Sequence, residues 1–194
     1  MPNRAEKSEL RRRLRRARAA LPKKERAAAT RAANGFLKRF IRRGSRIGVY
    51  WPVGSEMRLS GFVQTALSRG AELYLPYIEP DSLRLWFTPY RGDAAQAERK
   101  RGRGSLHIPQ FGGKKIRAHR LHVLFVPLVG IDRQGYRLGQ GGGYYDVSLA
   151  TLRGRLRPRT VGVGFACQLC DVLPHEPHDI QLDAFVCERG IIRF

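Results

Sequence analysis

The sequence predicts an α/β fold: one domain over residues 1–194, with a mostly parallel, twisted sheet and helices on both of its faces. Three observations lead to this prediction. Short apolar runs typical of buried strands alternate with amphipathic segments typical of helices. The connections between them are short, which favours parallel strands joined by helices. The chain has 194 residues, of which 42% are hydrophobic, and this suffices for one sizeable core.

Two helices are predicted before the sheet begins. Residues 7–21 place apolar side chains three or four positions apart, on one helix face: Leu10, Leu14, Ala17 and Leu21. The other faces carry arginines, which we interpret mostly as a solvated basic surface: Arg11, Arg12, Arg13, Arg15, Arg16 and Arg18. Residues 24–42 form the second predicted helix, and Leu21-Pro22 separates the two.

The next segment predicts a β-α-β unit. Residues 46–51 form a strand that Pro52 stops, residues 59–68 form a helix, and residues 72–76 form the next strand. Short connections make these two strands parallel, with a right-handed crossover. Residues 83–88 alternate as a strand does.

The second half of the chain supplies the rest of the predicted sheet. Residues 91–105 are expected to form a mobile loop or a short helix. The apolar runs 123–129 and 160–165 are typical of buried strands, and residues 184–187 with 191–192 close the sheet.

Ligands of open α/β sheets bind beyond the carboxyl ends of the strands. This rule places Trp51, Pro52 and Glu56 at the ligand-binding edge. Trp51 can stack on an aromatic ring, and Glu56 can accept hydrogen bonds from ring N–H groups. The alternative for Glu56 is a polar loop residue that precedes a helix.

The stretch RLGQGGGYYD, residues 137–146, carries the clearest functional signal, because four glycines stand within five positions. Such glycines provide either positive φ angles or close approach to the backbone. The flanking Arg137 and Asp146 favour close approach by a phosphate. Residues 144–156 can supply a helix N-terminus for that phosphate, and Asp146 is a hard-oxygen ligand for magnesium. The alternatives are a surface turn, with Asp146 as a helix cap.

Two familiar phosphate motifs do not match this loop. A P-loop needs Gly-Lys followed by Ser or Thr, and no lysine stands among these glycines. A dinucleotide fingerprint needs its glycines directly after a strand, whereas residues 130–136 intervene here. The predicted sheet is therefore Rossmann-like without being dinucleotide-binding.

The cysteines and the absence of export signals bear on the compartment. No apolar run is long enough to span a bilayer and no secretory signal is evident, so a cytoplasmic protein is expected. Cys167, Cys170 and Cys187 are then expected to be reduced thiols. Cys167 and Cys170 with His175 and His178 could form a zinc site, but thiols that help to fill the core are favoured.

One longer pattern joins these features. It comprises Pro127-Leu128-Val129-Gly130-Ile131-Asp132, a turn at Gln134-Gly135, then Arg137-Leu138-Gly139, Gly141, Gly143 and Tyr144-Tyr145-Asp146. This pattern resembles the signature of the 5-formyltetrahydrofolate cyclo-ligase family, also called methenyltetrahydrofolate synthetases. The resemblance extends in order from Lys7 to Val186, and His107-Ile108-Pro109-Gln110 matches a further element imperfectly.

The resemblance implies roles for individual residues. ATP binding is implied for Lys7, Arg11, Arg137, Leu138, Gly139, Gln140, Gly141, Gly142, Gly143, Tyr144 and Tyr145. Folate binding is implied for Trp51, Glu56, Gln140 and Tyr144, and magnesium binding for Asp146 and Asp179. Arg137 and Tyr144 are the implied catalytic residues. Lys7 and Arg11 stand at i and i+4, so both lie on one helix face as a phosphate clamp requires.

The implied activity is ATP- and magnesium-dependent conversion of 5-formyltetrahydrofolate to 5,10-methenyltetrahydrofolate, with release of ADP and phosphate after phosphorylation of the formyl oxygen. A monomer acting on folate and ATP, without membrane partners, is expected. The formal net charge of +21, from 37 Lys+Arg and 16 Asp+Glu, suits these polyanions and equally suits non-specific nucleic-acid binding. A basic nucleic-acid-binding protein and another ATP-using ligase on the same scaffold are the alternatives.

Overall fold

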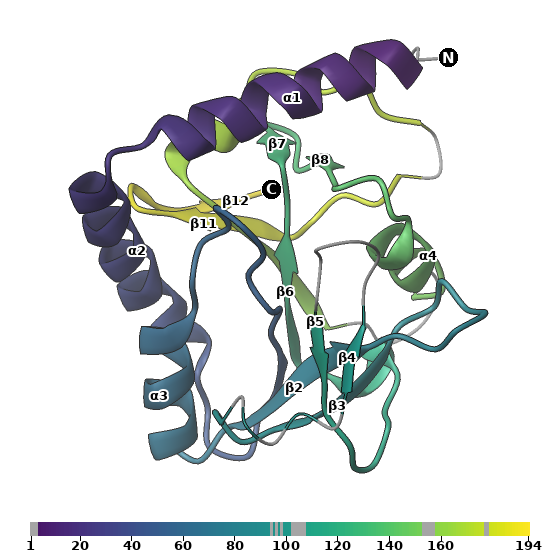
Figure 1. The fold of residues 1–194 in the computed structure, drawn as a ribbon. Coiled ribbons are helices and arrows are strands. Elements are labelled where there is room, and N and C mark those ends of the chain that lie inside the picture. The colour runs from purple at the N-terminus through teal and green to yellow at the C-terminus, as the bar shows by residue number, and fades with distance from the viewer. Residues whose placement is uncertain are drawn as a thin grey trace.

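A seven-stranded mixed sheet forms the centre of the computed structural model (Figure 1). The structure describes residues 4–93, 95, 97, 99–101, 108–152, 158–176 and 179–194. In spatial order the strands are β12 (Gly190–Arg193), β11 (Ala184–Cys187), β9 (Arg159–Val163), β6 (Val123–Pro127), β1 (Arg46–Gly48), β2 (Glu72–Tyr77) and β3 (Trp86–Tyr90). Neighbours are parallel from β11 to β2, and the two edge strands, β12 and β3, are antiparallel. The predicted mostly parallel sheet is confirmed.

Helices cover both faces of this sheet and the end to which its central strand points. Helices α2 (Lys23–Leu37) and α3 (Ser60–Ser68) lie on one face, and the short α4 (Tyr144–Ala150) lies near the other (Figure 1). Helix α1 (Arg4–Ala20) runs across the end of the molecule to which β6 points. Short 3-10 helices are found at η1 (Lys38–Phe40), η3 (Ala118–Arg120) and η4 (Ala166–Gln168).

The central strand β6 shows how the two faces are built. Phe125 packs in a cluster with α2 and α3 residues, whereas Leu124 and Val126 pack in a second cluster that includes Leu149 of α4. Successive side chains of a strand point to opposite faces, so a continuous apolar run is required where both faces are covered. The apolar run at 123–129, which predicted this strand, is therefore explained by burial of the strand on both faces.

A second, three-stranded sheet lies where β6 ends. It has the order β10 (Leu169–Cys170), β7 (Gly130–Asp132), β8 (Arg137–Leu138), and α1 lies above it (Figure 1). Leu14 of α1 packs here against Val129, Leu138 and Leu173. The buried Gln168 side chain donates to the carbonyls of Leu128 and Val129 at 2.8 and 3.0 Å and accepts from the Phe165 N–H at 2.8 Å. These bonds join the ends of β6 and β9.

Several boundaries differ from those predicted. The first strand ends at Gly48, although the Val49 N–H still donates to the Tyr74 carbonyl of β2 at 2.8 Å. Residues 83–85 precede β3 instead of pairing in the sheet, and the Leu85 N–H donates to Ser148 of α4 at 2.8 Å. Helix α4 ends at Ala150, and residues 153–156 of the predicted helix lie outside the described residues.

The segment 91–105, predicted to be a mobile loop or a short helix, contains a strand that was not predicted. This strand, β4 (Arg99–Arg101), pairs with β5 (Ile108–Gln110), while residues 94, 96, 98 and 102–105 lie outside the described part. No helix in the described part of the chain combines the length and apolar character needed to cross a bilayer.

Candidate functional site

A tight turn delivers the chain to the glycine-rich loop. The buried Asp132 accepts hydrogen bonds from the backbone N–H groups of Gln134, Tyr136 and Leu173, at 2.9, 2.9 and 3.2 Å. Gly135, in the predicted turn, has φ +90°. The chain therefore reverses after β7 and returns as β8, so that Arg137 pairs with Ile131 at the start of the loop.

The four glycines of the loop have different structural reasons. Gly141 and Gly143 adopt positive φ angles of +98° and +72°, which side chains resist. At Gly139 a Cβ would lie 2.9 Å from Nη1 of Arg137, and at Gly142 it would lie 3.2 Å from the Tyr144 ring. Both predicted uses of glycine therefore occur, and the close approach seen here is made by the protein's own side chains.

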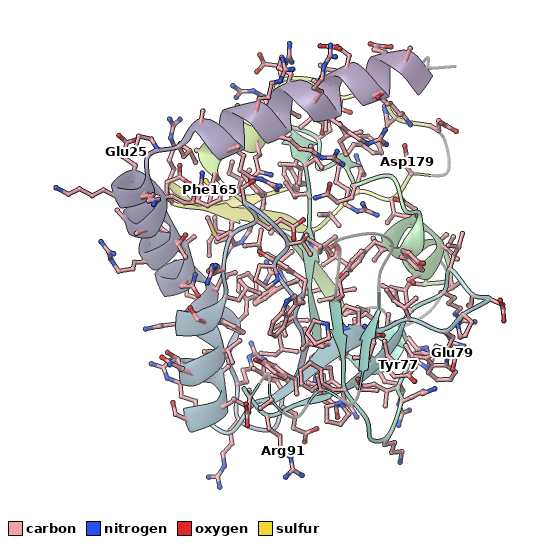
Figure 2. The ribbon with its side chains drawn as sticks, in the orientation of Figure 1. Glu25, Tyr77, Glu79, Arg91, Phe165 and Asp179 are labelled. Atoms are coloured by element: carbon pink, nitrogen blue, oxygen red, sulfur yellow. The ribbon has the colours of Figure 1, made fainter. Side chains whose placement is uncertain are left out.

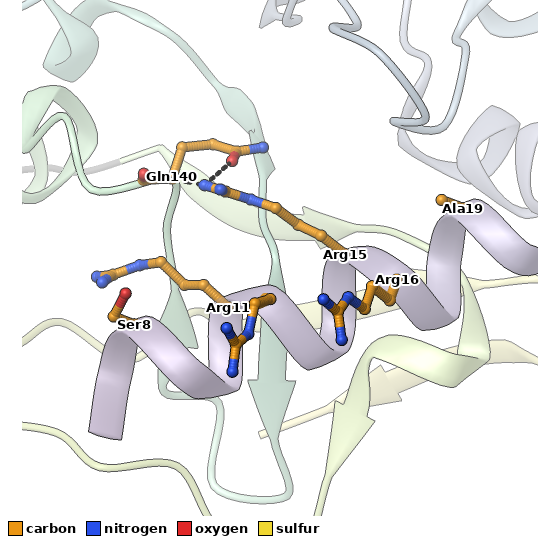
Figure 3. A pocket seen from close by; sticks show the side chains of 7 residues that line it. Ser8, Arg11, Arg15, Arg16, Ala19 and Gln140 are labelled. Atoms are coloured by element: carbon orange, nitrogen blue, oxygen red, sulfur yellow. Dashed lines mark hydrogen bonds between the residues drawn. The ribbon is translucent and has the colours of Figure 1, made fainter. Parts of the chain in front are cut away.

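Two arginines of α1 hold the carbonyl side of the loop. Arg11 Nε donates to the Gly139 carbonyl at 2.9 Å. Arg15 Nη2 donates to the Gln140 carbonyl at 3.2 Å and to its side-chain Oε1 at 2.6 Å (Figure 3). In a trans peptide the C=O and the following N–H point in opposite directions. The N–H groups of Gln140 and Gly141 consequently point away from α1.

The N–H groups of the loop are available for a ligand. Within the described part of the chain, no protein acceptor is found for the backbone N–H groups of residues 139–143. The surroundings favour an anion as that ligand. Burial, followed by repulsion from Arg15, lowers the pKa of Arg11, and a nearby negative charge would relieve both effects.

Arg137 and Asp146 form an ion pair across the loop. Arg137 Nη2 lies 2.5 Å from Asp146 Oδ1, with the arginine side chain 4% exposed and the aspartate side chain 48% exposed. Arg137 Nε and the Tyr145 hydroxyl are both buried without a hydrogen-bond partner among the described residues. Burial, reinforced by the charge of Glu56, raises the pKa of Tyr145, so its hydroxyl stays neutral.

Glu56 faces the loop from the chain segment that follows β1. This buried carboxylate accepts from the Val53 N–H at 3.0 Å and from Gln140 Nε2 at 2.7 Å. Arg18 of α1 supports the same segment, because its Nε donates to Ser55 Oγ at 2.9 Å and its Nη1 to the Leu128 carbonyl at 3.3 Å. Burial lowers the pKa of Arg18, and the charge of Glu56 opposes that shift.

A cavity of about 880 Å³ brings most of the predicted site residues together. Its lining includes the predicted residues Trp51, Glu56, Arg137, Gly139, Gln140, Gly141, Gly142, Gly143, Tyr144, Tyr145 and Asp146, together with Arg15, which the sequence prediction omitted. Apolar residues of the lining include Leu75, Ile78, Leu83, Leu85 and Pro109. A more open cavity of about 690 Å³ adjoins it and shares Arg15 and Gln140 (Figure 3).

The remaining predicted residues lie outside the lining of the larger cavity. Leu138 is buried against Leu14, and Arg11 lines the open cavity beside α1. Lys7 Nζ lies 3.2 Å from Glu176 Oε1 and 3.8 Å from Asp179 Oδ2, and Figure 2 shows Asp179 beside the N-terminal half of α1. The two cations of the predicted phosphate clamp thus contact different partners.

No ready-made metal site is present among the described residues. No group of three His, Cys, Asp or Glu side chains is found there that could hold an ion. Asp146 and Asp179 each contact a cation of the chain, Arg137 and Lys7 respectively. Cys167 and Cys170 are free thiols whose pKa values burial raises, and His178, named for a zinc site, lies outside the described residues.

Sequence reasoning missed Arg15 and Arg18 as site residues. A signal for Arg15 was present, because it stands four residues after Arg11 and eight after Lys7, on the same helix face. Arg18 stands four residues after the buried Leu14 and thus faces the protein. Gln140, the partner of Arg15, lies 125 residues away in the sequence, and Ser55 and Leu128, the partners of Arg18, lie 37 and 110 residues away, so no local pattern identifies them.

Comparisons with known proteins identify the family to which the chain is similar. The family model described as 5-formyltetrahydrofolate cyclo-ligase family matches residues 3–188. The 5-formyltetrahydrofolate cyclo-ligase of Escherichia coli is 33% identical over 142 residues, covering 72% of this chain and 76% of the relative. That of Mycolicibacterium smegmatis is 30% identical, with 96% of both chains covered. The structure of Aquifex aeolicus 5,10-methenyltetrahydrofolate synthetase superposes with a TM-score of 0.77 at 28% identity, covering 96% of this chain and 92% of that one.

The positive φ angle at Gly141 yields a prediction about stability. Gly141→Ala should lower the free energy of unfolding by about 1–2 kcal/mol, because the new Cβ opposes this backbone conformation. Space is not the cause, since the nearest atom, Arg11 Cζ, lies 3.9 Å from the position that the new Cβ would take. Gly35→Ala, at a helical and uncrowded position in α2, is the matched control and should raise stability by roughly 0.5–1 kcal/mol. Equal effects of the two changes in denaturant titrations would contradict this account of the loop.

Proposed function

We propose a reaction scheme from one premise: the chain belongs to the 5-formyltetrahydrofolate cyclo-ligase family. It therefore converts 5-formyltetrahydrofolate to 5,10-methenyltetrahydrofolate, with ATP as co-substrate. The observation that carries the scheme is the cavity of about 880 Å³, which the loop lines together with Glu56 and Trp51 and whose loop N–H groups have no acceptor among the described residues. The loop suits phosphates, and Trp51 with Glu56 suits a polar aromatic ring system.

The chemistry requires activation of the formyl oxygen. A formamide carbonyl is a poor electrophile for the neighbouring nitrogen 10 of the folate, because its oxygen is a poor leaving group. Transfer of the γ-phosphoryl group of ATP to this oxygen forms an O–P bond, breaks the bond to ADP, and creates a phosphate leaving group. Nitrogen 10 then attacks the formyl carbon and loses its proton, and phosphate departs with that oxygen and can carry the proton. Such a reaction depends on positioning and charge neutralisation more than on a protein nucleophile.

The loop is the proposed phosphate-binding element. Backbone N–H groups of residues 139–143 hydrogen-bond the phosphate oxygens, as Gly-rich backbone does elsewhere. Arg137 lines the same cavity as the loop, and its buried Nε has no hydrogen-bond partner among the described residues, so it can neutralise charge that develops on the transferred group. Arg11 already contacts the loop at Gly139 and supplies a second guanidinium. Lys7 reaches the phosphates only if it leaves Glu176 and Asp179.

The part of the cavity around Trp51 and Glu56 is the proposed folate site. Trp51 packs against Tyr90 and Phe111, with ring centroids 6.5 Å apart in each case, and these contacts fix its ring as a stacking surface. Glu56 accepts hydrogen bonds from N–H groups of the folate ring. Tyr144, the first residue of α4, lines the same cavity and positions the formyl group beside the loop.

Magnesium fits this site as an ion that arrives with ATP. It commonly binds through substrate phosphates and only one or two protein carboxylates, so a preformed cluster is unnecessary. Asp146 lies at the loop and is half exposed, so it can supply one oxygen ligand. Asp179 is the second proposed ligand, and its use requires the contact with Lys7 to open. The ion supplies charge neutralisation on the phosphates, and the protein residues orient them.

The assigned role of Arg137 can be tested on turnover and on nucleotide affinity. Wild-type protein should form the methenyl product, measured by its absorbance, with ATP and not without it.

Arg137→Ala should weaken binding of a non-hydrolysable ATP analogue by about ten- to a hundredfold, the value of a hydrogen bond to a charged group. Folate binding without nucleotide should change little. Arg133→Ala is the control, since this exposed arginine pairs with the exposed Asp171. Unchanged ATP affinity in calorimetry would show that the loop is misassigned.

The role of Asp146 predicts a metal-specific effect. In Asp146→Asn the magnesium concentration for half-maximal turnover should rise about tenfold or more, because the amide is a weaker ligand than a carboxylate. Asp179→Asn should raise it less. Asp171→Asn, at an exposed aspartate, should leave the titration unchanged. If Asp146 serves only α4 and Arg137, its substitution will lower the melting temperature and leave the magnesium titration where it was.

A further inference from the structure

The Gln140 side chain is hydrogen-bonded to Glu56, the carboxylate that is proposed to recognise folate. Its Nε2 donates to Glu56 Oε1 at 2.7 Å, and the other carboxylate oxygen accepts from the Val53 N–H at 3.0 Å. Glu56 is only 8% exposed, so little of it remains open to a ligand. In this state each carboxylate oxygen accepts a hydrogen bond from the chain itself.

The Gln140 amide that binds Glu56 resembles the folate N–H groups that are expected to replace the amide. An amide NH₂ and the N–H donors of a folate ring present the same hydrogen-bond chemistry to a carboxylate. Folate can use Glu56 Oε1 fully only when the Gln140 amide leaves. Gln140 is suited to such a movement, because its side chain is on an exposed loop residue between two glycines, one of them at φ +98°.

Arg15 connects this contact to α1. Its guanidinium donates to both oxygens of Gln140, the backbone O at 3.2 Å and the side-chain Oε1 at 2.6 Å (Figure 3). The amide oxygen is thereby held while the amide nitrogen reaches Glu56. Three groups from three distant segments thus form one chain of hydrogen bonds: Arg15, Gln140 and Glu56.

We propose that Gln140 is an intramolecular placeholder for the folate ring and that Arg15 is the positioning residue that holds it. Folate displaces the amide, and this frees Gln140 and Arg15 at the phosphate-binding loop. Folate binding is therefore coupled to the state of the loop that receives ATP. The inference rests on the proposed function, because it takes Glu56 as the folate-binding carboxylate.

Coupling of this kind has a defined thermodynamic consequence. Phosphates that hold the loop away from Glu56 raise the affinity for folate. Folate in turn raises the affinity of the loop for phosphates, and the two affinities change by the same factor. Without the placeholder, folate meets no competitor at Glu56. The folate affinity in the absence of nucleotide then increases, and the effect of nucleotide on it disappears.

The test uses Gln140→Met, which keeps the length of the side chain and removes both polar groups, and Arg15→Ala. Dissociation constants for 5-formyltetrahydrofolate are measured by calorimetry with and without a non-hydrolysable ATP analogue. Gln140→Met should bind folate about fivefold or more tightly without nucleotide, and the analogue should no longer strengthen binding. Arg15→Ala should change both quantities in the same direction and by less.

Arg16→Ala is the matched control. It removes one arginine from the same helix, and Arg16 points away from Gln140 (Figure 3). Its folate affinity and nucleotide coupling should equal those of the wild type. Unchanged or weaker folate binding by Gln140→Met would overturn the placeholder, as would an equal effect of Arg15→Ala and Arg16→Ala. Absence of turnover by the wild type would instead contradict the proposed function itself.

Discussion

The orientation of one loop's peptide groups is the constraint on which the site depends. The loop offers its N–H groups to a ligand because Arg11 and Arg15 of α1 bind the carbonyls of Gly139 and Gln140 on the other side. This arrangement requires α1 to lie across the carboxyl edge of the sheet. Leu14 packs there against Val129 and Leu138, and apolar burial thus sets the distance from which the arginines reach the loop.

Buried polar groups connect that edge to the sheet. Asp132 orients the turn before β8, Gln168 joins the ends of β6 and β9, and Arg18 links α1 to Ser55 and Leu128. Each satisfies backbone or hydroxyl groups that would be costly to bury unpaired. The strand ends therefore have little freedom, and side chains from distant segments meet around a single cavity. The net charge of +21 adds a long-range attraction for ATP and folate, both of which are anionic.

Local patterns predicted what local physics determines. The apolar run at 123–129 indicated a buried strand, which is covered on both faces. The glycines of the loop indicated either positive φ angles or close approach to the backbone, and positive φ angles occur at Gly141 and Gly143. Arg15, Arg18 and the pairing of Lys7 with Glu176 were not predicted, since their partners are fixed only when the chain folds. Strand ends shifted for the same reason: Leu85 pairs with Ser148 of α4, a contact that alternation of residues does not encode.

The central claim is that the loop and the Glu56 side of the cavity bring the formyl oxygen to the γ-phosphorus of ATP. Substrate carrying ¹⁸O in its formyl group tests this most directly, with mass spectrometry of the inorganic phosphate released during turnover. The claim predicts one labelled oxygen in the phosphate for each methenyl product formed, because the formyl oxygen departs with the phosphoryl group. Unlabelled phosphate at full turnover, with the label in water, would mean that ATP hydrolysis drives the reaction by another route and would contradict the account.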